Sequence, residues 1–184
     1  LYIPTEHSLH VYHRIQALRE TAVGSPHLDL RLCGLKALAS LRLEKGYRDY
    51  GHDMDNTDTL LEMGLGFTAD MSKAGGFKGK DKVLAQRAQM REEGGLRKRL
   101  VSIVVQDAPE VMLYHGETVF REGVSVGDVR AGSYGHTLGG SVGLAHIVAE
   151  GENRVNKKYI QDANWEVEIA GSRYPIKVTL QPPY

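Results

Sequence analysis

The chain has 184 residues, of which 41% are hydrophobic, enough to bury one good core or two small ones. Its 23 basic and 23 acidic side chains balance, so no overall field gathers nucleic acid or an anionic membrane surface around it. Because no apolar run approaches the roughly 20 residues that span a bilayer, we expect no membrane partner.

The single cysteine, Cys33, cannot form an internal disulfide, and its leucine neighbours predict a small buried side chain in a reducing compartment. The chain opens without Met, and Leu1–Pro4 reads as the tail of a β-strand. We therefore expect a longer polypeptide, whose N-terminal region is a partner of this chain.

A first helix is predicted to begin at Thr5, a good N-cap residue, and to end near 24–26. Its apolar residues recur every three or four positions, as on one helix face: Val11, Ile15, Leu18 and Ala22. Three histidines fall on the other side: His7, His10 and His13. They are interpreted as a solvated polar face, because zinc needs further ligands that this spacing does not supply, and we expect no metal site.

A second helix is predicted over about 34–45, with Leu35, Leu38, Ala39 and Leu43 available for burial. Gly46 is placed to close that helix in the left-handed conformation.

The next stretch mixes both kinds of element. Residues 62–70 look like a strand, and 81–93 predict a short helix that Gly94 stops. The basic run Arg97 to Arg99 is interpreted as a solvated linker that begins the next strand.

Beyond Gly95 the sequence changes to short apolar runs separated by Gly or Asn, as in a sandwich or barrel. The expected strands are 100–106, 118–121, 124–129, 142–148, 165–169 and 176–180, with hairpin turns at 122–123 and 171–173. The fold class is therefore predicted to be α+β, with residues 1–96 in one domain and 97–184 in a second, all-β domain.

Charged residues of both signs gather after the second helix, where Arg42, Glu44, Arg48 and Asp53 surround two glycines. Such a cluster can bind a polar ring and a carboxylate. The alternative is a structural ion-pair network that holds the end of the helix to the loop after it.

Two motifs in this region carry a family resemblance. Ser40–Gly46 reads S-L-R-L-E-K-G, and Leu61–Phe67 reads L-E-M-G-L-G-F. Both resemble, in the same order, segments of the glycine-cleavage T-protein superfamily, and the similarity continues to Pro182–Tyr184. The resemblance implies a partial folate-binding α+β domain followed by a C-terminal antiparallel β-barrel.

The resemblance also indicates a branch of the family. T-proteins have a folate-contacting arginine at the position of Leu38, and leucine cannot replace the hydrogen bonds of a guanidinium. This departure favours the flavin-linked dimethylglycine and sarcosine dehydrogenases, in which FAD lies on a domain outside this chain.

The resemblance implies a folate-binding module of a one-carbon-transfer enzyme, with tetrahydrofolate as cofactor. The module would form 5,10-methylenetetrahydrofolate from a methylated amine, dimethylglycine or sarcosine, or from an aminomethyl donor. The alternative is a non-catalytic regulatory subunit similar to that of pyruvate dehydrogenase phosphatase.

The acidic catalytic residue of similar proteins belongs to sequence before Leu1, so no catalytic residue is expected in this chain, which should be inactive alone. The expected folate-binding residues are Arg42, Glu44, Tyr50, Asp53 and Tyr184. The resemblance implies the mitochondrial matrix in a eukaryote and the cytoplasm in a bacterium.

Overall fold

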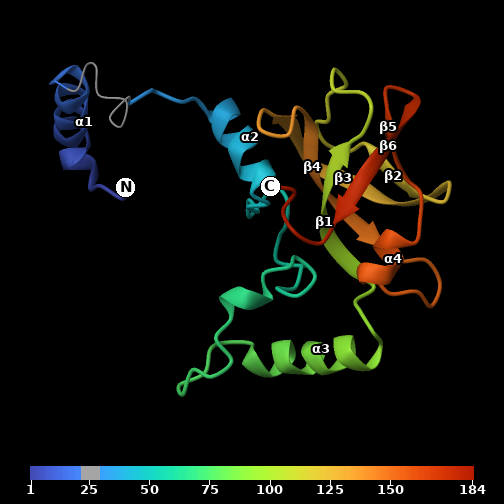
Figure 1. Cartoon of the computed structure of the whole chain (residues 1–184). Coiled ribbons are helices and arrows are strands. Elements are labelled where there is room, and N and C mark those ends of the chain that lie inside the picture. Colours follow the sequence, from blue (N-terminus) through green and yellow to red (C-terminus); the bar gives the residue numbers. More distant parts are fainter. Residues whose placement is uncertain (22–29) are drawn as a thin grey trace. The chain divides into compact units, whose positions relative to one another are not determined.

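A computed structural model describes residues 1–21 and 30–184 (Figure 1). They form two units, Leu1–Leu35 and Lys36–Tyr184. The first unit contains helix α1, Thr5–Thr21, which confirms the first predicted helix. Its predicted end at 24–26 lies outside the described residues.

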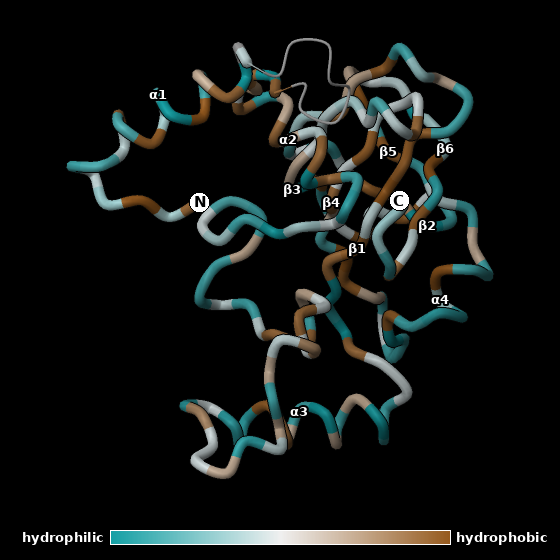
Figure 2. Tube along the Cα trace, turned by 60° about the vertical axis from the view of Figure 1, so that its left-hand side comes forward, coloured by the Kyte–Doolittle hydropathy of each residue, from teal (hydrophilic) through white to brown (hydrophobic). Residues whose placement is uncertain are grey.

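The first unit buries little of its apolar surface. Val11 and Ile15 are half-buried and Leu18 is exposed, and hydrophobic and hydrophilic residues alternate along α1 (Figure 2). Cys33 is a free, exposed thiol, so its predicted burial is wrong. The segment around it has no regular structure, and its neighbouring leucines are exposed too, so no packed surface encloses the sulfur.

Helix α2, Leu35–Glu44, confirms the second predicted helix, and Gly46 ends it with φ +64°. Of its predicted core residues, only Leu43 is buried, whereas Leu35 and Leu38 are 83% and 59% exposed. The prediction was wrong for these two because the buried residues of α2 begin only at Ser40.

The loop after α2 leads through the 3-10 turn η2, Gly66–Thr68, to helix α3, Lys80–Glu92. The strand predicted over 62–70 is absent, because the backbone there bonds locally: the N–H of Leu65 donates to the carbonyl of Leu60 at 2.7 Å. Helix α3 matches the prediction, and Gly94 follows it with φ +74°.

The rest of the second unit is a closed antiparallel barrel (Figure 1). Its strands are β1 Lys98–Val105, β2 Thr118–Arg121, β3 Val124–Gly135, β4 Gly140–Val148, β5 Trp165–Ile169 and β6 Ser172–Thr179. They pair in the order β1-β4-β3-β2-β5-β6, and β6 closes on β1 from Ser102↔Thr179 to Val105↔Ile176. The short helix α4, Lys157–Gln161, precedes β5. The predicted α+β fold with an antiparallel barrel is confirmed.

Two hydrophobic clusters hold this unit together. The larger one fills the barrel with side chains such as Val101, Ile103 and Ile147. The smaller one lies outside the barrel and joins its strands to α2 and the 60s loop: Leu43, Met63, Leu100, Ala131, Val142 and Leu144. This second cluster brings the S-L-R-L-E-K-G segment onto β1, β3 and β4.

Candidate functional site

A buried ion pair joins α2 to the loop that follows it. Nη1 of Arg42 donates to Oδ2 of Asp53, whose side chain is 0% exposed. The same oxygen accepts the N–H of Asp49 at 2.8 Å, and Oδ1 lies 2.9 Å from Nδ1 of His52. Because both carboxylate oxygens have partners and no contact with solvent, Asp53 organises the loop around itself.

Glu44 is the last residue of α2, and its side chain connects the helix to the turn between β3 and β4. Its carboxylate accepts the N–H of Thr137 at 2.7 Å, the hydroxyl of Thr137 at 2.9 Å and the N–H of Leu138 at 3.1 Å. The residue is only 2% exposed. A Cβ at Gly135 would lie 3.0 Å from Oε1, so the turn approaches the carboxylate closely. Glu44 therefore anchors the barrel to α2.

The end of the chain returns from the barrel to the same place. The N–H of Tyr184 donates to the carbonyl of Glu44 at 3.2 Å, and Nζ of Lys45 lies 4.2 Å from the centroid of its ring. The Tyr184 side chain remains 59% exposed. The structure thus brings Arg42, Glu44, Asp53 and Tyr184 to the C-terminal end of α2.

Tyr50 lies in the loop between these residues and is 68% exposed. It borders a cavity of about 100 Å³, whose lining residues are Tyr50, Met54, Asp55, Asp58, Thr59, Leu60, Met63 and Leu65. None of the other four candidate residues lines this cavity. Tyr50 therefore offers an aromatic ring at a cavity, while Arg42 and Asp53 hold the loop that carries it.

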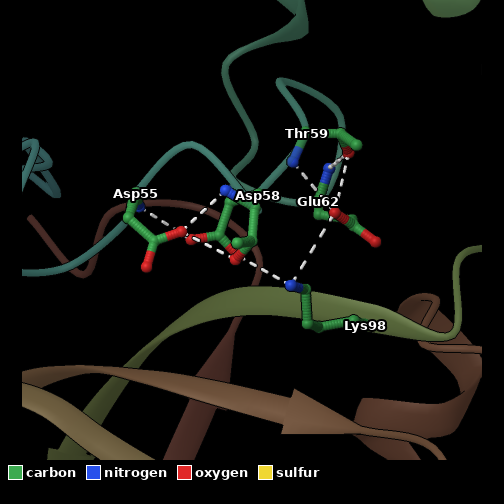
Figure 3. Close-up of polar contacts among 6 residues, drawn as sticks. Asp55, Asp58, Thr59, Glu62 and Lys98 are labelled. Carbon is green, nitrogen blue, oxygen red and sulfur yellow. Dashed lines mark hydrogen bonds and ion pairs between the residues drawn. The ribbon is translucent and has the colours of Figure 1, made fainter.

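A polar cluster that includes two of the lining residues, Asp58 and Thr59, joins this loop to Lys98 of β1 (Figure 3). Nζ of Lys98 lies 2.6 Å from Oδ1 of Asp58 and 3.9 Å from Oε2 of Glu62. Glu62 in turn accepts the N–H and the hydroxyl of Thr59, both at 2.9 Å. Burial opposes the charge of Asp58, but the hydrogen bond and charge of Lys98, together with the hydrogen bond from the N–H of Asp55, outweigh it and lower the pKa of Asp58.

This cluster was missed in the sequence, where Lys98 was interpreted as part of a solvated linker. The available signal was the spacing of Asp55, Asp58 and Glu62, which puts acidic groups three and four residues apart. The spacing does not indicate that these acidic residues face Lys98, because Asp58 and Lys98 are 40 positions apart in the sequence.

The described residues contain neither a cluster of metal ligands nor a membrane-spanning helix. Over 1–21 and 30–184, no three His, Cys, Asp or Glu side chains gather as they would around a metal ion. In the same residues no helix has the length and apolar character needed to cross a membrane.

Family models match both parts of the chain. The GCVT N-terminal domain matches residues 1–73, and the glycine cleavage T-protein C-terminal barrel domain matches residues 98–184. A crystal structure of the glycine cleavage system aminomethyltransferase T from Bartonella henselae has the same fold, with a TM-score of 0.63 and 23% identity, over 91% of this chain and 43% of that one.

Three relatives extend the comparison. The chain is 39% identical to the formaldehyde-forming 4-methylaminobutanoate oxidase of Paenarthrobacter nicotinovorans over 85% of its own length. It is 30% identical to mouse mitochondrial sarcosine dehydrogenase over 100%, and 32% identical to the mouse mitochondrial pyruvate dehydrogenase phosphatase regulatory subunit over 99%.

The chain spans only 17%, 19% and 20% of these three relatives. The chain nevertheless matches two domain models of the same family in chain order, the N-terminal domain over residues 1–73 and the C-terminal barrel over residues 98–184. The chain belongs to the glycine-cleavage T-protein superfamily.

Proposed function

We propose that this chain is the folate-binding module of a one-carbon-transfer enzyme and forms one wall of its tetrahydrofolate site. Bound tetrahydrofolate supplies the nitrogen atoms that take up the one-carbon unit as 5,10-methylenetetrahydrofolate. The module contributes by position: it holds the folate where the unit is released, so that an encounter between two molecules becomes a reaction within one complex.

The observation that carries this proposal is the convergence of the family motif, the barrel and the chain end. Glu44 of S-L-R-L-E-K-G accepts hydrogen bonds from the β3–β4 turn through its side chain and from Tyr184 through its carbonyl. Three segments far apart in the sequence thereby surround the end of α2.

The candidate residues then divide into two roles. Tyr50 and Tyr184 are exposed aromatic side chains, and they would face the folate. Arg42, Glu44 and Asp53 already have protein partners, and they would be positioning residues that hold the two tyrosines in place.

The size of the cavity limits what this chain can bind alone. Sites for drug-sized ligands occupy about 300 to 1,000 Å³, whereas the cavity at Tyr50 has about 100 Å³. It is too small to hold a whole folate. We infer that the N-terminal region of a longer polypeptide supplies the remaining walls and the acidic catalytic residue.

We place the chain in the amine-oxidising branch of the family. The position of the T-protein arginine is occupied by the exposed Leu38, and two of the relatives described above are an oxidase and a dehydrogenase of methylated amines by name. FAD would then be bound by another domain, and dimethylglycine or sarcosine would be the donor. A matrix location would follow in a eukaryote, and a cytoplasmic one in a bacterium.

The regulatory-subunit alternative is less favoured. One relative carries that name, but no feature of the described residues favours a regulatory role over folate binding. The loop after α2 also keeps the turns at Gly46 and Gly51, both with positive φ.

The test is calorimetric titration of the full-length protein with a reduced folate. Replacing Tyr184 by Ala should weaken folate binding by roughly 1 to 3 kcal/mol, the scale of aromatic stacking and one hydrogen bond. Tyr50→Ala should act in the same direction. Tyr114→Ala, which removes an equally exposed tyrosine from the loop before β2, is the control. Equal affinities in all three variants would contradict the proposed wall.

A further inference from the structure

Two guanidinium groups meet beside Gly64, in the second family motif. Arg48 comes from the loop after α2 and Arg99 comes from β1. A side-chain carbon at Gly64 would lie 3.0 Å from Nη2 of Arg48 and 3.9 Å from Nη2 of Arg99. Since arginine stays protonated in proteins, two positive charges are held at one place.

Arg48 is fixed in this position by neutral partners. Its Nε donates to the carbonyl of Met63 at 3.0 Å, and its Nη1 donates to the carbonyl of Gly46. The charge of Asp53 acts on Arg48, but Asp53 is already paired with Arg42. In the part of the chain that the structure describes, the Nη2 of Arg48 has no acceptor.

Arg99 has still less compensation. Across the described residues it takes part in no ion pair, and its buried Nε has no hydrogen-bond partner. Burial lowers the pKa of Arg99, and the charge of Arg48 lowers it further. Its neighbour Lys98, by contrast, is paired with Asp58. A half-buried charge next to a like charge is costly unless an opposite charge joins them.

We propose that Arg48 and Arg99 together bind one oxyanion, a phosphate or carboxylate group, over Gly64. Both guanidiniums present free N–H groups, and the planar fork of arginine matches the paired oxygens of such groups. Gly64, with φ +69°, has no Cβ to fill the space beside the two Nη2 atoms. Neither arginine lines the cavity at Tyr50, and the proposal does not depend on the proposed folate function.

The test is calorimetric titration of the full-length protein with inorganic phosphate and, separately, with succinate, in a buffer free of other oxyanions. Arg99→Gln should weaken the binding of the preferred anion about tenfold or more, as expected for the loss of charge-assisted hydrogen bonds. Arg99→Lys should also weaken it, because lysine keeps the charge but loses the fork. The anion that binds more tightly identifies the ligand as a phosphate or a carboxylate.

Arg97→Gln is the matched control, since it removes the same charge from an exposed residue two positions away. It should change the affinity less than twofold. Thermal melting of each variant establishes that it is folded, and if Arg99→Gln fails to fold, Arg99→Lys decides the outcome. The proposal is overturned if neither anion binds, if the folded Arg99 variants bind as the parent protein does, or if Arg97→Gln weakens binding equally.

Discussion

Charged residues around Gly46 and Gly51 are visible in the sequence, but their partners are not. Asp53, in the loop after α2, pairs with Arg42 at the end of α2, as the ion-pair alternative predicts. Glu44 instead bonds Thr137, which is 93 residues away. A pattern of local spacing cannot predict such a distant partner, so the sequence indicates that this glutamate is important without revealing how it acts.

Glu44 should therefore contribute strongly to stability. Glu44→Ala would leave two N–H groups of the β3–β4 turn without their buried acceptor, and we expect the free energy of unfolding to fall by about 2 to 4 kcal/mol. Urea unfolding measures the change. Glu92→Ala, at an exposed position of α3, should alter it by less than about 0.5 kcal/mol. A similar loss in both variants would show that Glu44 has no special role.

His146 is a second residue whose environment the sequence does not reveal. It lies on β4 opposite Asp128 of β3, and its buried Nε2 has no hydrogen-bond partner among residues 1–21 and 30–184. Burial lowers the pKa of His146 from 6.5; Asp58 and Asp128 oppose this change, while Arg130 and Lys98 add to it.

This lowered pKa makes stability depend on pH. The unfolded chain binds the proton more readily than the folded one, so the contribution of His146 is complete above about pH 6.5 and is lost as the pH falls toward the folded-state pKa. We expect the free energy of unfolding to decrease between pH 7 and pH 5, and His146→Gln to reduce that decrease. His13→Gln, on the exposed side of α1, should not. Parallel pH profiles for His146→Gln and the parent protein would refute this account.

Helices and hairpins were predicted well wherever a terminating residue accompanies the periodic pattern. Gly46 and Gly94 end α2 and α3, and the turn at 122–123 has positive φ at both residues, as a tight hairpin requires.

The prediction of a strand over 62–70 was wrong because its apolar residues alternate as in a strand, while the backbone forms turns. The last part of β3 and the five-residue α4 were missed, since Arg130–Gly135 has no β-branched residue and α4 is too short to show a period.

The pairing of β3 with β4 depends on a glycine whose need is not visible in the sequence. A Cβ at Gly127 would lie 1.8 Å from the carbonyl oxygen of His146, so the two strands cannot keep their spacing around a larger residue. Gly127→Ala should lower the free energy of unfolding by at least about 3 kcal/mol. Gly75→Ala, at a position with open space and no positive φ, should be nearly neutral. Chemical denaturation of both variants compares them, and an equally mild effect would show that the strands adjust.

At the scale of the whole molecule, the predicted change from helical to β-structure near residue 97 follows from composition alone, whereas closure of the barrel does not. Short alternating strands suit a sandwich or a barrel equally. A barrel closes through the pairing of β1 with β6, which joins residues more than 70 positions apart, and no local pattern predicts such a pairing. The prediction of a barrel therefore came from the family resemblance. The expected division into residues 1–96 and 97–184 stays a prediction.

The proposed dependence on other parts of a polypeptide has a direct test. We expect the purified 184-residue chain to form no 5,10-methylenetetrahydrofolate, because the acidic catalytic residue that the family resemblance implies is not among its own. A folate-product assay of the purified chain, with tetrahydrofolate and dimethylglycine or sarcosine, would measure this. Turnover by the 184-residue chain alone would mean that it contains the reaction centre.

The pairing of β1 with β6 also has a consequence during synthesis on the ribosome. β4, β3, β2 and β5 can each find a partner as they emerge, but β1 keeps one unpaired edge until β6, Ser172–Thr179, has left the exit tunnel. An unpaired edge is a template for association with other chains. A nascent chain that stalls before residue 172 therefore exposes an aggregation-prone strand, and we expect such chains to need a chaperone that the finished barrel does not.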